Sequence, residues 1–139
     1  MTIDRQGDST TELAVAELIE SGEIKRHARK VVKVYEQRRD LFADLLRARL
    51  GSSIEFDVPD GGLAFWVRFS AGIDEMKLVA DANRHHVRFL PGSCFAMDSG
   101  NVSGARLGFA SLDDSELVQA VERLHRAIAQ QTGAVQATR

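Results

Sequence analysis

Cysteine is nearly absent from this chain of 139 residues, in which Cys94 is the single example. One cysteine excludes an internal disulfide and is typical of proteins that work in a reducing, cytoplasmic compartment. No apolar run approaches the ~20 residues that a membrane-spanning helix needs, and the polar N-terminus differs from a signal peptide. We therefore expect a cytoplasmic protein with no membrane partner.

Lysine is also scarce, and the four examples are Lys25, Lys30, Lys33 and Lys77. No glycine-rich phosphate loop with its following lysine is present. The net charge of −2 gives no indication of a nucleic-acid or membrane surface on this chain. We also expect no metal site, because the spacing of the candidate ligands fits no common zinc site and a fourth ligand is missing. These candidates are His85, His86 and Cys94.

The rest of the composition is that of an ordinary folded domain. Hydrophobic residues make up 44% and charged residues 27% of the sequence, as in soluble globular proteins. A chain of this length can form one domain that buries ~70% of its unfolded surface.

Hydrophobic periodicity and turn residues predict the order of the elements. The chain is expected to begin with a short helix, which follows the capping-box sequence at Ser9 and is ended by Gly22, and with a long helix over 24–50. Strands over 54–58 and 63–69, joined by a turn at 59–62, come next, followed by a helix from Asp74 to about 85. The rest is expected to be a strand over 87–90, a loop over 93–104, a strand over 105–110 and a helix capped by Ser111. This order predicts an α+β fold: a small, mostly antiparallel sheet with helices packed on one face, preceded by a short helix and a long helix.

The predicted helices differ in which residues face the core. The last helix has the apolar stripe Leu117, Val121, Leu124 and Ile128, and the third helix has Ile73, Met76, Val79 and Ala80. The long helix has a basic surface made of Arg26, Arg29, Lys30, Lys33, Arg38, Arg39, Arg47 and Arg49. We interpret this surface as a solvated helix face with some acidic partners elsewhere, because no aromatic residues alternate with the basic ones.

The strand around Arg106 has two faces with different side chains. The apolar row, which can pack on helices, is Ala105, Leu107 and Phe109. Arg106 lies in the other row, with the small residues Gly108 and Ala110. A guanidinium is hard to bury on a strand without an anionic partner, and its planar fork binds a carboxylate bidentately. That partner is either a protein carboxylate, which is the commoner case, or the carboxylate of a ligand.

The residues at 106–112, Arg-Leu-Gly-Phe-Ala-Ser-Leu, are followed by an acidic turn and an apolar helix. This stretch resembles the end of a fold-type-I pyridoxal-phosphate aminotransferase. Two upstream stretches match the same pattern in order, Pro59-Asp60-Gly61-Gly62-Leu63-Ala64-Phe65-Trp66 and Leu90-Pro91-Gly92-Ser93-Cys94-Phe95. The resemblance covers nearly the whole chain, up to about Gln131.

One branch of that family is more similar than the rest. The N-terminal run Asp4-Arg5-Gln6-Gly7-Asp8, with the stretches 17–22 and 38–40, resembles the MocR-type transcriptional regulators of the GntR superfamily. These regulators fuse a DNA-binding head to an aminotransferase-like body. The resemblance implies that any contact with DNA is made only through an N-terminal domain that this sequence does not include.

The resemblance also implies roles for five residues. Arg106 is expected to bind the α-carboxylate of an amino-acid substrate or effector, and the pocket around it is expected to be shaped by Gly61, Gly62, Pro91 and Gly92. Turn chemistry alone is a sufficient alternative explanation for the glycine pair.

Pyridoxal 5′-phosphate is implied for the full-length parent protein, but not for this sequence alone. None of the four lysines stands in the Ser-x-x-Lys context of the family, whose cofactor lysine lies further upstream. We therefore expect no catalytic or cofactor-binding residue here and no transamination by this sequence alone. By this resemblance, residues 1–22 are the last helix of the large domain, 23–131 the small domain with its linker helix, and 132–139 a tail.

Three hypotheses about function remain. The first is the effector-binding body of a MocR-type regulator, and the second is the small domain of a free-standing amino-acid aminotransferase. The third is a non-catalytic α+β interaction module in which Arg106 is paired within the protein. In the family, the counterpart of the first helix packs on the large domain. We therefore expect this sequence to form a homodimer through that apolar helix.

Overall fold

The computed structural model describes residues 8–96 and 102–136. The run at 4–7 and part of the predicted 93–104 loop therefore lie outside the described residues. The chain divides into two compact units, Met1–Glu36 and Gln37–Arg139. None of the described helices is long and apolar enough to cross a membrane.

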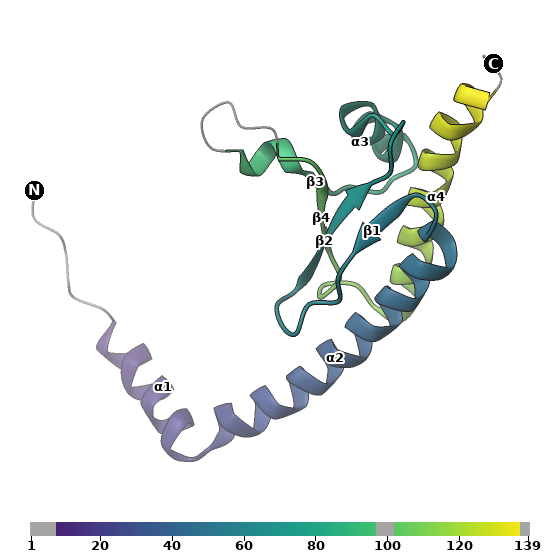
Figure 1. The fold of residues 1–139 in the computed structure, drawn as a ribbon. Coiled ribbons are helices and arrows are strands. Elements are labelled where there is room, and N and C mark those ends of the chain that lie inside the picture. Colours follow the sequence, from purple (N-terminus) through teal and green to yellow (C-terminus); the bar gives the residue numbers. More distant parts are fainter. Residues whose placement is uncertain (1–7, 97–101, 137–139) are drawn as a thin grey trace, which may run out of the picture. The chain divides into compact units, whose positions relative to one another are not determined.

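The first unit contains helix α1 (Ser9–Glu20) and the first part of helix α2 (Glu23–Leu50) (Figure 1). The predicted cap at Ser9 is wrong by one residue. The carboxylate of Asp8 accepts hydrogen bonds from the backbone N–H of Thr10 at 3.0 Å and the hydroxyl of Thr11 at 2.7 Å. An aspartate that satisfies two donors is therefore the N-cap. The predicted helix end at Gly22 is confirmed, since α1 stops at Glu20.

The second unit contains the rest of α2 and a four-stranded sheet (Figure 1). Its remaining elements are β1 (Ile54–Phe56), β2 (Ala64–Phe69), α3 (Glu75–Arg84), β3 (Leu90–Pro91), the 3₁₀ helix η1 (Gly92–Phe95), β4 (Ala105–Gly108) and α4 (Asp114–Gln136). The strands lie in the order β1-β2-β4-β3, and every neighbouring pair is antiparallel. The predicted α+β fold with its antiparallel sheet is confirmed.

The core lies between one face of this sheet and the helices. At its centre, the ring of Phe65 on β2 contacts the rings of Phe42 on α2 and Phe109 after β4, with centroids 5.4 and 5.6 Å apart. The predicted stripe of α4 is confirmed, since all four of its residues are buried: Leu117, Val121, Leu124 and Ile128. Each such apolar side chain contributes about 1.5–3 kcal/mol when it leaves water.

All four strands differ from the prediction at one end or both, and β2 begins at Ala64 rather than Leu63 while β4 ends at Gly108 rather than Ala110. The first strand stops at Phe56 rather than Val58, three residues before Pro59, which has no N–H to donate to a ladder. The third strand covers Leu90–Pro91 rather than 87–90. Pro91 is accommodated there because β3 lies at the edge of the sheet.

The helices also differ in detail. On α3, Leu78 and Ala82 are fully buried, whereas Met76 is 64% exposed, so the predicted inward stripe is rotated about the helix axis. Helix α4 is capped by Asp113 rather than Ser111 and continues past the predicted end to Gln136.

The cap of α4 is a reciprocal pair. A side-chain oxygen of Asp113 accepts from the N–H of Glu116 at 2.9 Å, and the carboxylate of Glu116 accepts from the N–H of Asp113 at 2.8 Å. The bond from the Glu116 N–H, followed by that from the Ser115 hydroxyl, holds the pKa of Asp113 below its usual value. This capping box fixes the turn between β4 and α4.

Candidate functional site

Arg106 lies on β4, and the strand alternation directs its side chain away from the core. Its neighbours Ala105 and Leu107 are 0% and 6% exposed, whereas Arg106 is exposed. The two-faced strand predicted from the sequence is therefore confirmed. The guanidinium stands on the sheet face opposite the one that packs against the helices.

Four residues on the same face surround this arginine. In the ladder, Trp66 of β2 lies opposite Arg106 on one side, and Leu90 of β3 lies opposite it on the other. The pair Ala64 and Gly108 comes next along β2 and β4. A Cβ atom added at Gly108 would find its nearest neighbour, the carbonyl of Leu63, only at 4.0 Å. The small residues beside Arg106 therefore leave open space over the sheet.

No acidic side chain of the described residues forms an ion pair with Arg106. Arg68, an arginine on the same sheet face, does have an acidic partner, since it lies 3.9 Å from Glu55 across the β1–β2 ladder. The alternative in which Arg106 is paired within the protein thus finds no partner in the described part of the chain. The carboxylate of a ligand remains the other candidate partner.

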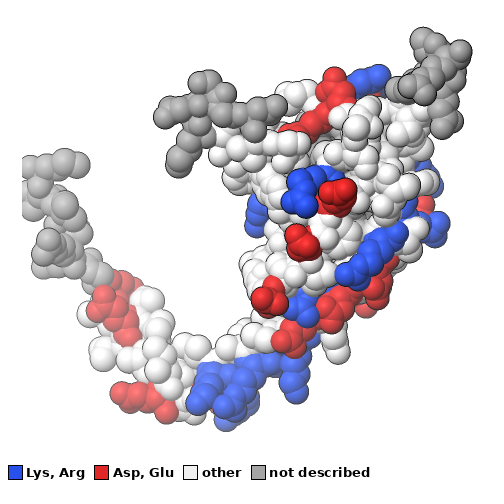
Figure 2. All heavy atoms as spheres, in the orientation of Figure 1, with Lys and Arg blue, Asp and Glu red and all other residues white. Residues whose placement is uncertain are grey.

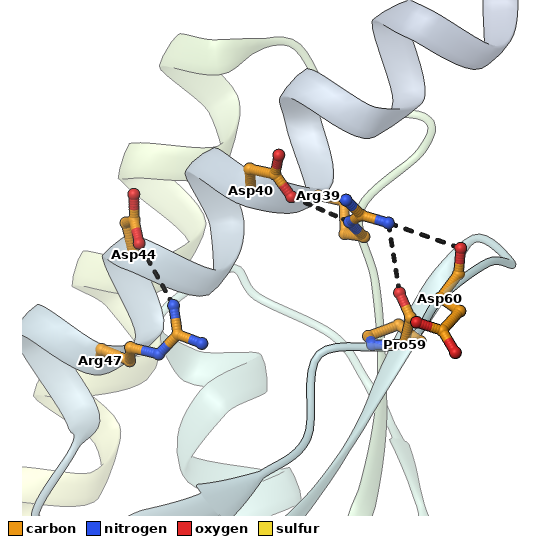
Figure 3. Close-up of polar contacts among 6 residues, drawn as sticks. All are labelled: Arg39, Asp40, Asp44, Arg47, Pro59 and Asp60. Atoms are coloured by element: carbon orange, nitrogen blue, oxygen red, sulfur yellow. Dashed lines mark hydrogen bonds and ion pairs between the residues drawn. The ribbon is translucent and has the colours of Figure 1, made fainter.

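Gly61 and Gly62 lie in the connection between β1 and β2, at the end of β4 that carries Gly108. This connection is anchored to α2 by Arg39, whose Nη1 donates to the carbonyl of Pro59 at 3.4 Å (Figure 3). Gly62 has a φ of 89°, so the turn itself favours glycine there. Gly61 has no positive φ, and a Cβ atom at this position would meet nothing within 4 Å. No steric contact within the described residues requires a glycine at Gly61.

Pro91 and Gly92 lie at the other end of β4, where Pro91 is the ladder partner of Ala105. Both residues are buried. A Cβ atom at Gly92 would lie 1.9 Å from the carbonyl oxygen of Val102. Close backbone packing therefore explains this glycine without a ligand. The structure brings the three predicted segments to β4, with Arg106 between the other two, and their binding roles stay predictions.

Sequence reasoning missed two contributors to this region, Trp66 and Glu75. The ring of Trp66 contacts the ring of Phe95 edge-on at 5.5 Å, so it forms an apolar wall beside Arg106. Glu75, in the first turn of α3, accepts hydrogen bonds from Gly92 and Gly104. The alternation of β2 gave a signal for Trp66, whereas nothing local to Glu75 points to partners so distant in sequence.

The basic residues of α2 were predicted as a solvated face, and part of this prediction is wrong. Arg38 is half-buried, and its Nη1 donates to the carbonyl of Ala110 at 2.7 Å. Figure 3 shows that Arg39 and Arg47 also lie beside carboxylates of the same helix, Asp40 and Asp44, at 2.9 and 3.3 Å. Arg38 and Arg39 thus hold two chain segments at the same end of the candidate site, the end of β4 that carries Gly108.

Schiff-base formation with pyridoxal phosphate needs a lysine, and the four lysines of this chain all lie on helices. Lys25, Lys30 and Lys33 lie on α2 in the first unit, and Lys77 is exposed on α3. None of the four lies on the strands that surround Arg106. The described residues also contain no group of three or more His, Cys, Asp or Glu side chains that could hold a metal ion.

Two hollows of the second unit lie away from Arg106. A cavity of about 60 Å³ is lined by residues of α2, β4 and α4, among them Phe42, Leu107 and Leu124. A groove of about 440 Å³ runs between the start of α4 and His86. Arg106 lines neither hollow, so it stands on an open sheet face that forms at most one wall of a pocket.

The family model described as aminotransferase class I and II matches residues 7–124. The chain is 28% identical, over 117 residues, to the 2-aminoadipate transaminase of Thermus thermophilus, and the match covers 84% of the chain and 29% of that protein. It is also 28% identical, over 114 residues, to the probable rhizopine catabolism regulatory protein MocR of Rhizobium meliloti, covering 82% of the chain and 23% of that protein.

A crystal structure agrees with these similarities. The chain superposes on LysN, the α-aminoadipate aminotransferase of Thermus thermophilus solved with N-(5′-phosphopyridoxyl)-L-leucine. The TM-score is 0.76 at 28% identity, and the match covers 86% of the chain and 31% of LysN. The chain thus spans less than a third of the length of each of these relatives.

Proposed function

The chain belongs to the class I and II aminotransferase family, and we propose that it is the amino-acid-binding small domain of a MocR-type transcriptional regulator. The family depends on pyridoxal phosphate. In this proposal the cofactor and its lysine belong to a large domain, and a separate N-terminal domain contacts DNA. Arg106 binds the α-carboxylate of the amino-acid effector, and the edges of its pocket are formed by Gly61, Gly62, Pro91 and Gly92.

The observation that carries this proposal is the environment of Arg106. Its guanidinium is exposed on a sheet face with open space beside it and has no acidic partner within the described residues. A guanidinium held at a fixed place on a strand suits bidentate binding of a carboxylate. Because the sheet face is open, the remaining walls of the pocket come from another part of the protein.

The choice of a regulator over an enzyme rests on the N-terminal sequence. The run Asp4-Arg5-Gln6-Gly7-Asp8 and the stretch at 38–40 support the MocR type. A free-standing aminotransferase is the second candidate function, and the fold match to LysN favours it. The DNA sequence upstream of the codon for Met1 distinguishes the two, because a winged helix-turn-helix domain ahead of the large domain means a regulator. A large domain without such a head means an enzyme and contradicts the first candidate.

The role of Arg106 is tested by binding. In the whole protein that carries this chain, loaded with pyridoxal phosphate, we expect Arg106→Ala and Arg106→Lys to weaken the binding of L-leucine or L-2-aminoadipate about tenfold or more. This loss corresponds to one charge-assisted bidentate contact of about 1.5–3 kcal/mol. Isothermal titration calorimetry measures both amino acids.

Arg68→Ala is the matched control. Arg68 is an exposed arginine on the same sheet face, but it pairs with Glu55, and we expect its removal to leave both affinities unchanged. An Arg106→Ala protein that binds as tightly as the wild type would overturn the proposed role.

A further inference from the structure

We propose that Glu75 is a positioning residue for the Arg106 site, because its carboxylate bridges the end of β3 and the approach to β4. Its Oε1 accepts from the N–H of Gly92 at 2.7 Å, and its Oε2 accepts from the N–H of Gly104 at 2.9 Å. Both bonds join an anionic acceptor to a backbone donor, a class stronger than neutral hydrogen bonds. One half-buried side chain of α3 thus holds two backbone segments that are far from it in sequence.

The two segments are also in direct contact. The N–H of Gly92 donates to the carbonyl of Gly104 at 2.6 Å as well as to Glu75. Neither glycine has space for a side chain. A Cβ atom would lie 1.9 Å from the carbonyl oxygen of Val102 at Gly92 and 2.4 Å from the carbonyl oxygen of Val67 at Gly104. The carboxylate and the two glycines therefore form a closed polar cluster, which we call the glycine bridge (Glu75, Gly92 and Gly104).

The glycine bridge lies next to Arg106. Gly104 precedes Arg106 by two positions, and the ladder pairs Arg106 with Leu90, two positions before Gly92. Strand β3 has only two residues, so its own ladder provides few hydrogen bonds to hold this edge of the sheet. The two hydrogen bonds that Glu75 accepts add to the few ladder bonds of β3 and hold Leu90 beside Arg106.

The position of Glu75 is fixed in turn by α4. The side chain of Gln131, 4% exposed, accepts from the N–H of Asp74 at 3.1 Å. Its Nε2 donates to Asp81 Oδ2 at 3.1 Å. These bonds attach α3 to α4 at its N-cap, Asp74, and at Asp81, so the Glu75 carboxylate projects from a backbone that α4 holds on both sides.

The common role of an acidic residue in a first helical turn does not account for these contacts. Such a residue stabilises a helix through its charge near the N-terminus, and the cap of α3 is already provided by Asp74, which accepts from the N–H of Lys77 at 3.0 Å. The Glu75 oxygens instead bind donors outside the helix. Glu75 therefore acts on the strands rather than on α3.

The test compares Glu75→Gln with Asp74→Ala in the full 139-residue chain. Glu75→Gln keeps the side-chain size but places an NH₂ group against one backbone donor. We expect the amides of Gly92 and Gly104 to exchange with deuterium about tenfold faster, and the NMR signals of Leu90 and Arg106 to shift. Asp74→Ala removes only the helix cap, so it lowers the melting temperature but leaves exchange at both glycines unchanged.

A second measurement connects the glycine bridge to binding and rests on the proposed function. In the pyridoxal-phosphate-loaded whole protein, Glu75→Gln should weaken L-leucine binding, whereas Asp74→Ala should not. Unchanged glycine exchange in Glu75→Gln overturns the inference whether or not L-leucine binds. Faster exchange with unchanged L-leucine affinity also overturns the positioning role. A wild-type protein that binds no amino acid contradicts the proposed function, while the exchange result still decides whether Glu75 holds the strands.

Discussion

Arg106 on β4 lies directly opposite Trp66 on β2, and both side chains are on the sheet face that turns away from the helices. The edge-on contact of the Trp66 ring with Phe95 fixes an aromatic surface next to a guanidinium. A carboxylate that binds Arg106 therefore has an apolar surface beside it. This combination suits a ligand that has an anionic group and an apolar body.

The exposed position of Arg106 predicts that it contributes little to folding. We expect Arg106→Ala to change the free energy of unfolding by no more than about 0.5 kcal/mol, as for exposed residues in general. Arg38→Ala should cost about 1–3 kcal/mol, because it removes the charged donor to the carbonyl of Ala110. Urea denaturation followed by circular dichroism measures both. A larger loss for Arg106→Ala than for Arg38→Ala would make Arg106 a structural residue.

The glycines near Arg106 should differ in how well they tolerate replacement by alanine. Gly104→Ala combines a φ of 119° with a backbone clash at 2.4 Å, so we expect it to cost about 1–3 kcal/mol or more. Gly61→Ala meets no atom within 4 Å and should leave stability unchanged or raise it by about 0.4–1 kcal/mol. Thermal unfolding gives both values. If Gly61→Ala is stable but binds L-leucine less tightly in the whole protein, the pocket role predicted for Gly61 is supported.

The fold could be predicted from the sequence because its elements have strong local signals. The stripe at Leu117 and Val121, the alternation around Phe65 and the stop at Gly22 each follow from periodicity or turn chemistry. The details that differed depend on tertiary contacts. Met76 has the helical spacing of a core residue, but α3 packs through Leu78.

The candidate site was predictable only in part, for a similar reason. Arg106 could be singled out because the alternation of apolar and polar residues that identifies it lies within a single strand. Glu75 and Arg38 bind backbone groups 29 and 72 residues away in sequence, and an acceptor carbonyl or amide has no signature of its own. The position of these supports becomes visible only once the chain is folded.

The buried glutamine on α4 should be important for stability. Gln131 connects α4 to Asp81, whose side chain is 3% exposed. Gln131→Ala leaves a buried carboxylate with one donor fewer, and we expect a loss of about 1–3 kcal/mol. Gln130→Ala, an exposed neighbour on the same helix, is the control and should stay within about 0.5 kcal/mol of the wild type. Equal losses in the free energy of unfolding for the two variants, measured by denaturant titration, would contradict a stabilising role for the hydrogen bond between Gln131 and Asp81.

The cap of α4 should make folding sensitive to acid. Because the pKa of Asp113 is lowered in the folded state, first by the Glu116 N–H and then by the Ser115 hydroxyl, its charged form stabilises the folded chain. That stabilisation is complete above the usual Asp pKa of about 3.9 and is lost as the pH falls through the lower, folded-state pKa. Melting temperatures of Asp113→Asn and wild type should therefore converge below about pH 4. Ser115→Ala should fall between them, and a constant difference across all pH values would contradict the linkage.

The first unit predicts association of the chain with a second copy. No residue of α1 is buried, and its apolar side chains are exposed, including Leu13 at 72% and Ile19 at 60%. Figure 2 shows acidic side chains on α1 and basic side chains over the first part of α2. We expect the two copies to pair antiparallel, with the acidic helix of each beside the basic segment of the other and the apolar side chains between them.

Truncation tests this association. Burial of each large apolar side chain of α1 contributes about 1.5–3 kcal/mol, so a chain that begins at Glu23 should lose the dimer. Its sheet should still fold, because the core of the second unit contains no residue of α1. The double substitution Leu13→Ser and Ile19→Ser keeps the full length and should have the same effect. Sedimentation equilibrium measures all three proteins. A monomeric wild type, or a truncated chain that stays dimeric, would show that α1 does not bind a second copy, because the exposed apolar surface would then be either tolerated in water or irrelevant to the interface.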